Sequence, residues 1–401
     1  MDPRAGWTEP TQLVPGRKGG PRGDRTDSNT FHNGTVNLSK GHLRAENRAV
    51  LRAELLAWYG LNQRDLPWRR DANPYAIWVS EIMLQQTRVA VVVERYQAFL
   101  KRFPTLVALA LSAEEEVLAL WSGLGYYRRA RMLHKAAQFV VGQLNGTLPA
   151  SAAELRKLPG IGAYTGAAIA SIAYGEPVAV VDGNVERVLC RLESWDASKS
   201  GEAALRPRID ALAGELLDPR NPGDFNQALM ELGATVCLPR NPQCLICPWV
   251  KYCKTRGEHK TVPRARMVSR EVAYALSVRT GLQAGPGSRE VLLEKRPAAL
   301  TVMPGLWELP ALKEIEVPEE ELRMIVRHAI MHVNYYVRIR TVFEDDAETM
   351  TVAAGERHWV PLIEAAEMAL TGLARKVLTR AHLLTGTSRD VMTAASEPDL
   401  T

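Results

Sequence analysis

Four of the five cysteines lie within one short stretch of the chain, separated by six, two and five residues: Cys237, Cys244, Cys247 and Cys253. In a reducing compartment, such crowding favours metal ligation over disulfides. Zinc and an iron-sulfur cluster both accept four thiolates, so the spacing alone leaves both open. Basic residues surround the cysteines: Arg240, Lys251, Lys254 and Arg256. The segment therefore predicts a metal-bound loop that presents cations to a phosphate backbone.

Two acidic residues are candidates for acid-base chemistry. Asp182 follows the apolar run 178–181 and precedes the helical stretch 185–192, a place typical of a helix cap. Glu81 lies in the stretch 78–87, where Trp and Met at helical spacing usually form core and a glutamate is usually on the surface. The local patterns alone favour structural roles for both. Brought together by the fold, two carboxylates could serve as a proton donor and a fixed negative charge.

A glycine-containing turn, Leu-Pro-Gly-Ile-Gly-Ala-Tyr-Thr, occupies residues 158–165 between the helical runs 152–157 and 165–173. Such a turn before a helix N-terminus points backbone N–H groups outward, and the helix dipole there favours an anion such as a DNA phosphate. A plain connection between two helices fits the local pattern about equally well. The pattern is also that of a helix-hairpin-helix, which binds duplex DNA without reading its sequence. On this interpretation the DNA contacts are Gly160, Gly162 and Ala163.

The order of these motifs resembles the endonuclease III superfamily of DNA glycosylases, in which a hairpin and a following aspartate lie side by side. Bifunctional members carry a Schiff-base lysine where this chain has Tyr164. A tyrosine cannot form an imine, and Lys157 lies on the wrong side of the turn, so strand cleavage is not expected. The cysteine spacing matches the iron-sulfur loop of the superfamily, which implies a [4Fe-4S] cluster on the four cysteines.

Further blocks are similar to the adenine DNA glycosylase family over roughly residues 48–385: 66–70, 78–87, 123–127 and 225–228. This resemblance implies that Glu81 is the protonated acid for adenine N7, with its pKa raised by an apolar pocket. Asp182 would stay ionised and stabilise the oxocarbenium ion. Tyr164 and Asn184 would support these two carboxyl groups.

The resemblance also implies how the bases are held. Adenine leaves the stack for a pocket formed by Leu66, Trp68, Arg69 and Gln227. Gln86 and Tyr126 fill or wedge the duplex, and His332 is a candidate contact of the partner base. The implied substrate is double-stranded DNA with adenine opposite 8-oxoguanine or guanine. The family usually has Phe-Ser-His where this chain has Ile330-Met331-His332. Because Met331 offers no hydroxyl, we expect lesion discrimination to survive only in part.

The elements that would position these residues form a mostly α protein, a helix-hairpin-helix glycosylase with an iron-sulfur loop, followed by a smaller α+β Nudix-like domain. The stretch Met303–Pro310 resembles the entry strand of that second fold, but no glutamate-rich box follows it, so recognition is expected rather than pyrophosphate hydrolysis. The predicted segments are a disordered extension (1–45), a helical domain (46–253) with its hairpin (152–173) and cluster loop (237–253), a connector (254–270), the Nudix-like domain (271–385) and a flexible tail (386–401). Within the last domain we predict strands at 272–278, 291–295 and 335–343 and helices at 319–327 and 375–384.

Composition excludes few classes. The 401 residues exceed one ordinary core, and a net charge of +5 permits a nucleic-acid partner without establishing it. No run approaches the roughly 20 apolar residues of a membrane span, and because the first residues lack the charged, apolar and small-residue order of a secretory signal, we expect no secretion. Pro and Gly near the start argue against a transit peptide. We expect a soluble monomer in the bacterial cytoplasm, associated with the nucleoid, with no membrane partner; the sequence identifies no protein partner.

Two rival functions stay open. A thymine-mismatch or oxidised-pyrimidine glycosylase would keep the fold and change the substrate, but the block around Glu81 argues against it. A catalytically silent DNA-binding or redox module would need neither Glu81 nor Asp182. Measuring which base is released from defined duplexes separates these possibilities.

Overall fold

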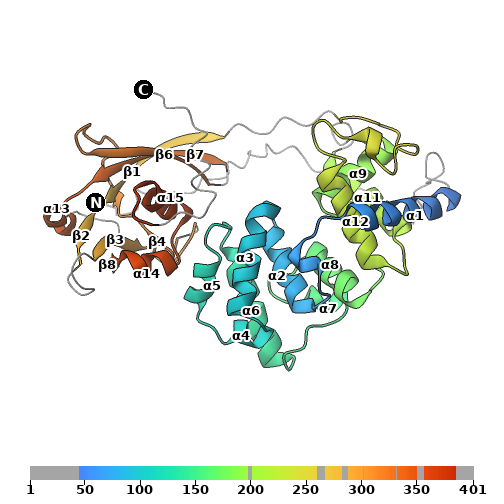
Figure 1. The fold of residues 1–401 in the computed structure, drawn as a ribbon, viewed down its shortest axis with the longest axis horizontal. Helices are drawn as coiled ribbons and strands as arrows, with labels where there is room; N and C mark the ends of the chain where they lie inside the picture. Colours follow the sequence, from blue (N-terminus) through green and yellow to red (C-terminus); the bar gives the residue numbers. More distant parts are fainter. Residues whose placement is uncertain are drawn as a thin grey trace, which may run out of the picture. The chain divides into compact units, whose positions relative to one another are not determined.

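The structure, a computed structural model, describes residues 45–196, 201–259, 267–281, 288–300, 302–330, 332–349 and 356–384 (Figure 1). The predicted N-terminal extension, up to residue 44, and the predicted tail at 386–401 lie outside these ranges. The middle of the predicted connector, residues 260–266, also lies outside them.

The first part of the described chain is helical. Its α-helices are α1 (Ala45–Asn62), α2 (Pro74–Leu84), α3 (Val89–Arg102), α4 (Leu106–Ala110), α5 (Glu114–Leu120), α6 (Arg128–Gln143), α7 (Ala152–Leu155), α8 (Ala163–Tyr174), α9 (Gly183–Glu193), α11 (Glu202–Leu216) and α12 (Pro222–Thr235), with short 3-10 helices η1 (Pro67–Arg69) and η2 (Cys244–Ile246). Local sequence sets several of their starts. The Asn73 side chain accepts the N–H groups of Tyr75 and Ala76 at the start of α2, and Pro74 is the first helical residue.

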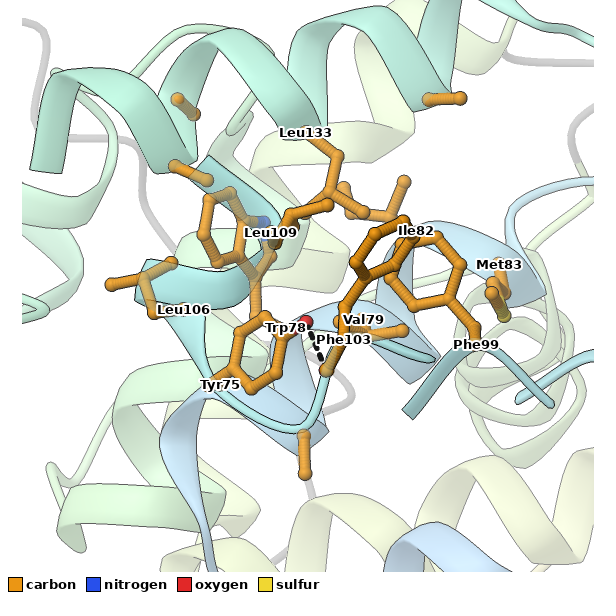
Figure 2. Close-up of a cluster of buried hydrophobic side chains, with 14 of the residues drawn as sticks. Tyr75, Trp78, Val79, Ile82, Met83, Phe99, Phe103, Leu106, Leu109 and Leu133 are labelled. Atoms are coloured by element: carbon orange, nitrogen blue, oxygen red, sulfur yellow. Dashed lines mark hydrogen bonds between the residues drawn. The ribbon is translucent and has the colours of Figure 1, made fainter. Parts of the chain in front are cut away.

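Helix α2 lies at the centre of the first apolar core. Figure 2 shows its side chains among those of α3, α4 and α6, and the Tyr75 hydroxyl donates to the Phe103 carbonyl at 2.9 Å. The rings of Phe99 and Phe103 meet edge to face with centroids 5.0 Å apart. Apolar packing on nearly all sides makes α2 a rigid support, so Glu81 in its last turns has little freedom.

A second core joins α1, α9, α11 and α12 and includes Leu55, Val188, Leu229 and Trp249. Helix α8 packs against both α2 and α12. Helix α8 therefore joins elements of the two cores. The Trp249 indole N–H donates to the Leu51 carbonyl at 3.0 Å, which fixes the cysteine-rich loop to α1.

The second part is built from two sheets. The strands are β1 (Val268–Leu276), β2 (Val278–Thr280), β3 (Arg289–Lys295), β4 (Trp307–Glu308), β5 (Ala311–Leu312), β6 (Leu322–Ile330), β7 (Val333–Thr341) and β8 (Arg357–Pro361), and the helices are α13 (Glu344–Thr349), α14 (Leu362–Glu367) and α15 (Gly372–Arg380). One sheet has the order β5-β1-β7-β6, with β1 and β7 parallel; in the other, β3 pairs with β2, β4 and β8. Figure 1 shows α15 between the sheets, where Val377 and Leu378 share a core with Val291 and Val337.

One predicted helix is wrong. The segment 319–327 forms most of strand β6, which pairs with β7 in antiparallel register. Val326 is fully buried opposite Val337. The segment forms a strand because hydrogen bonds to β7 satisfy its backbone and outweigh the helical pattern of the local sequence. Strand β1 also begins at Val268, inside the predicted connector, since it pairs with β7 from that residue onward.

The predicted fold class is confirmed: a mostly helical part is followed by a smaller α+β part. Among the described helices, none combines the length and apolar character that crossing a lipid bilayer requires.

Candidate active site

A cavity of about 580 Å³ opens among η1, the end of α2, α8, the start of α9 and α12. Its wall includes both candidate carboxyl groups, Glu81 and Asp182, which are far apart in sequence. Other predicted site residues in the wall are Leu66, Trp68, Arg69, Gln86, Tyr164, Asn184 and Gln227. A cavity that gathers two acids from separate helices is suited to acid-base chemistry on a bound group.

Glu81 is 5% exposed, and its Oε2 accepts the Tyr164 hydroxyl at 2.8 Å. Burial raises the pKa of Glu81 from 4.5 to about 7, and the charge of Asp182 adds to this, whereas the bond from Tyr164 and the charge of Arg69 oppose it. The carboxyl can therefore hold a proton near neutral pH. Burial also raises the pKa of Tyr164 well above 10, so this hydroxyl orients Glu81 and does not supply a proton itself.

Asp182 caps helix α9. Its Oδ1 accepts the backbone N–H groups of Asn184 at 2.9 Å and Val185 at 2.7 Å, and its Oδ2 accepts the Asn184 side-chain amide at 2.8 Å. These donors and the helix N-terminus stabilise a negative charge at this point. Asp182 is therefore both the cap of a helix and a residue of the cavity wall.

Arg187 fixes Asn184 in turn. Its Nη2 donates to Asn184 Oδ1 at 2.9 Å and to the Gly233 carbonyl at 2.7 Å, and its Nε donates to the Cys237 carbonyl at 2.8 Å. The sequence reasoning missed Arg187 because an arginine four residues into a helix has no local mark of function.

The predicted base-contact residues differ in whether they line the cavity. Trp68 is buried, meets Tyr96 edge to face at 5.5 Å, and still lines the cavity beside Leu66. Gln86 is exposed at the edge of the cavity, with a positive φ of 55°. Tyr126 is also exposed, with φ 46°, and is not among the residues that line the cavity.

The predicted contact to the partner base lies in the second part of the chain. His332 is exposed in the turn between β6 and β7 and is not a cavity residue. Met331, the departure from the family pattern, lies outside the described residues.

Two charged residues of the cavity wall were not predicted from the sequence: Arg64 and Glu231. Glu231 occupies an ordinary helical position in α12. The sequence signal that could have drawn attention to it is the arginine-rich segment 64–70, whose Arg64 and Arg69 bind it. The pairing links residues 167 positions apart, which no local pattern reveals.

The hairpin before α8 has the conformation that its glycines predict. Gly160 has φ +76°, and a Cβ at this residue would lie 2.5 Å from Met132 Cβ, so only glycine fits without a shift. Gly160, Gly162 and Ala163 are exposed, so the N-terminal N–H groups of α8 are open to a ligand.

The four cysteines of the predicted cluster are gathered in one place. Cys237, Cys244 and Cys253 each affect the pKa of Cys247, which burial raises to about 11. Arg191 Nη1 donates to Cys237 Sγ at 3.3 Å. In the part of the chain that the structure describes, no three His, Cys, Asp or Glu side chains have the geometry of a single-ion site. Four neighbouring thiols match the donor set of an iron-sulfur cluster.

Comparison with known proteins gives the family. Residues 79–208 match the model of the HhH-GPD superfamily of base excision DNA repair proteins. The adenine DNA glycosylase of Homo sapiens is 50% identical over 216 residues, which are 52% of this chain and 39% of that protein. That of Mycolicibacterium smegmatis is 44% identical over 205 residues, 51% of this chain and 69% of that protein. The chain belongs to the adenine DNA glycosylase family of this superfamily, as its motifs predicted.

The chain spans about two fifths of the length of the mammalian relatives that it matches. A solved structure of a thermostable thymine-DNA glycosylase is similar over 53% of this chain and 97% of that one, with 29% identity and a TM-score of 0.48.

The buried carboxyl makes a prediction about stability. Because burial raises the pKa of Glu81 from 4.5 to about 7, its contribution to stability is fully present below about pH 4.5 and is lost as the pH rises through 7. At about 1.4 kcal/mol per pKa unit, ionising it costs the folded protein on the order of 3 kcal/mol at pH 8. In thermal unfolding, we expect Glu81→Gln to be more stable than the unsubstituted protein at pH 8 and about equal at pH 5. The same difference at both pH values would contradict a buried, proton-bearing carboxyl.

Proposed function

We propose that this chain is a monofunctional DNA glycosylase that hydrolyses the N-glycosidic bond of adenine mispaired with 8-oxoguanine or guanine in base excision repair. One observation carries the proposal: a proton-holding carboxyl and a capped aspartate, Glu81 and Asp182, line the same cavity. Family membership supports adenine as the base. We further propose that the protein acts as a monomer on duplex DNA, in the bacterial cytoplasm at the nucleoid.

In this mechanism the adenine is flipped from the duplex into the cavity, beside Leu66, Trp68 and Gln227. Glu81 donates its proton to adenine N7, so the base leaves as a neutral molecule. A pKa of about 7 suits this step, because a useful acid must be protonated near neutral pH and still release its proton. Tyr164 keeps the carboxyl aimed into the cavity through its 2.8 Å bond.

Loss of the base leaves positive charge on the sugar. The carboxylate of Asp182 stabilises that oxocarbenium ion, and the N–H groups of Asn184 and Val185 hold it in place. Water then adds to the sugar and gives a proton to the Glu81 carboxylate, which restores the acid and completes the hydrolysis. Tyr164 offers no amine for a Schiff base, so the strand stays uncut.

The proposal is tested by base release under single turnover from duplexes with adenine opposite 8-oxoguanine, guanine and cytosine, and from a thymine-guanine mismatch. We expect free adenine, fastest opposite 8-oxoguanine, and no strand break before alkali treatment. Release of thymine would instead favour the pyrimidine rival. Duplex binding without release of any base would favour a catalytically silent module.

Lesion recognition is assigned to the second part of the chain, with its two sheets. We propose His332, exposed in the β6–β7 turn, as a contact of the partner base. Because Met331 stands where the family has serine, the ratio of rates opposite 8-oxoguanine and guanine is expected to be moderate. Equal rates of adenine release opposite both bases would contradict the role proposed for His332 in recognising the lesion.

A [4Fe-4S] cluster would be held by Cys237, Cys244, Cys247 and Cys253, where it would fix the loop that follows α12 and present its cations to DNA. The loop also helps to position a residue of the candidate active site. Arg187 joins the Cys237 carbonyl to Asn184, so the fold of this loop bears on the residue that supports Asp182.

The cluster proposal predicts the metal content. Protein purified without oxygen should contain iron and acid-labile sulfide in equal amounts and no zinc. Cys247→Ser should lose both and unfold at a lower temperature, because the loop loses its anchor. Cys190→Ser is the matched control, since Cys190 is buried in α9 among the second core. Zinc in the purified protein, or equal iron in both variants, would contradict the assignment.

A further inference from the structure

A second buried glutamate lies in the wall of the cavity. Glu231, from α12, has a fully buried side chain and lines the same cavity as Glu81. Its Oε1 accepts Arg64 Nε at 2.7 Å and the Arg64 backbone N–H at 3.1 Å. Its Oε2 accepts Arg64 Nη2 at 2.7 Å and Arg69 Nη2 at 2.9 Å. One carboxylate therefore holds two guanidinium groups, and the proposed chemistry gives it no part.

Glu231 stays ionised throughout the working range of such an enzyme. Burial alone would raise its pKa, but the hydrogen bonds from Arg64 and Arg69 lower it to about 2. The titration of Glu231 itself therefore does not shape the pH dependence near neutrality. Its negative charge is a fixed part of the cavity wall.

Arg69 is held by three groups. Besides Glu231, its Nη1 donates to the Arg64 carbonyl at 3.2 Å, and its guanidinium lies over the Tyr59 ring, 5.4 Å from the centroid. Arg69 lines the cavity together with Glu81, and its charge favours the ionised form of that acid. An arginine free to turn toward Glu81 would form an ion pair with it, and a paired carboxylate cannot donate a proton.

Neighbouring groups thus act on the pKa of Glu81 in opposite directions. The groups that act on it are the Tyr164 hydroxyl on α8, the Asp182 carboxylate before α9 and the Arg69 guanidinium on η1. The remaining charged groups of the cavity wall are Arg64 and Glu231, which bind each other. Of the cations that line the cavity, Arg69 is the one that acts on Glu81, and Glu231 restrains it.

We propose that Glu231 is a positioning residue for the proton donor: by holding the guanidinium of Arg69, it prevents an ion pair with Glu81 and keeps Glu81 protonated and able to act. This inference rests on the proposed glycosylase function. It assigns to Glu231 a role through Arg69 and not a contact with the reacting atoms.

The test is the pH profile of single-turnover adenine release by Glu231→Gln. If Arg69 turns to Glu81, the limb on which the rate falls with rising pH should move about one pH unit lower. Glu231→Gln should then be about tenfold slower than the unsubstituted protein at pH 8 and nearly equal to it at pH 5.5. A merely structural role would lower the rate by the same factor at every pH, and that result would overturn the proposal.

Two further variants complete the test, and Glu231→Asp serves if Glu231→Gln folds poorly. Glu231→Asp keeps the charge and should shift the limb less. In the double variant Arg69→Gln with Glu231→Gln, the cation is gone, so the limb should match that of Arg69→Gln alone. A double variant whose limb still lies lower than that of Arg69→Gln would show that Glu231 does not act through Arg69.

The control variant is Glu116→Gln, which removes the surface ion pair with Arg102 and should leave the profile unchanged. Iron content and thermal unfolding of each variant identify damaged protein. If the unsubstituted protein releases no adenine, the proposed function fails. If it does release adenine and the Glu231→Gln limb is unmoved, only this inference fails.

Discussion

Glu81→Gln is expected to reduce adenine release by about 10²–10⁴-fold, the usual contribution of a general acid, while duplex affinity is kept. Glutamine has nearly the shape of the protonated acid, so the 2.8 Å contact with the Tyr164 hydroxyl can persist in the buried site. It carries no acidic proton, so the base must leave unprotonated. Single-turnover release and a separate measurement of duplex binding test the two parts of this expectation.

The chain offers a closely matched control in Glu308. This residue is also buried, burial raises its pKa to about 7, and its Oε2 accepts a hydroxyl, that of Thr371, at 2.6 Å. It lies in strand β4, among the sheets, and is not a residue of the cavity wall. Glu308→Gln should therefore keep the rate of base release. If Glu81→Gln keeps its rate too, Glu81 is not the proton donor.

Asp182→Asn is expected to reduce the rate by roughly 10²–10³-fold, the scale on which a lost electrostatic stabiliser usually acts. The substitution removes the negative charge opposite the developing sugar cation and keeps the helix cap, because asparagine caps a helix about as well as aspartate. The rate should fall while the unfolding temperature stays almost the same. Single-turnover kinetics and thermal unfolding on the same preparation provide the comparison.

Two other variants separate charge from capping. Asp182→Ala loses the cap as well as the charge, so it should lose activity and also about 1 kcal/mol of stability. Asp218→Asn alters another buried aspartate, which accepts the Arg220 N–H at 2.9 Å outside the cavity, and it should keep its rate. Equal losses for Asp182→Asn and Asp218→Asn would show a general effect of charge removal and would end the role proposed for Asp182.

Several features of this protein could be predicted from short stretches of sequence, because their physical causes lie within those stretches. A helix cap needs only a few consecutive residues, so the position of Asp182 before α9 could be read from the sequence. The turn at Gly160 needs a positive φ, which glycine supplies. Strand β6, Leu322–Ile330, could not be read in this way, since its pairing with β7 outweighs the propensity of the segment.

By itself the sequence determined the residue types and their order: four cysteines in one loop, two glycines in a hairpin, and two carboxyl groups in distant segments of the chain. Only the tertiary structure decided what those carboxyl groups can do. The Tyr164–Glu81 bond spans 83 positions and the Arg64–Glu231 bond spans 167, and burial by distant segments sets the pKa of Glu81 near 7. A pKa depends on the solvent and charges around a group in space, and these come from the packing of helices that the sequence places far apart.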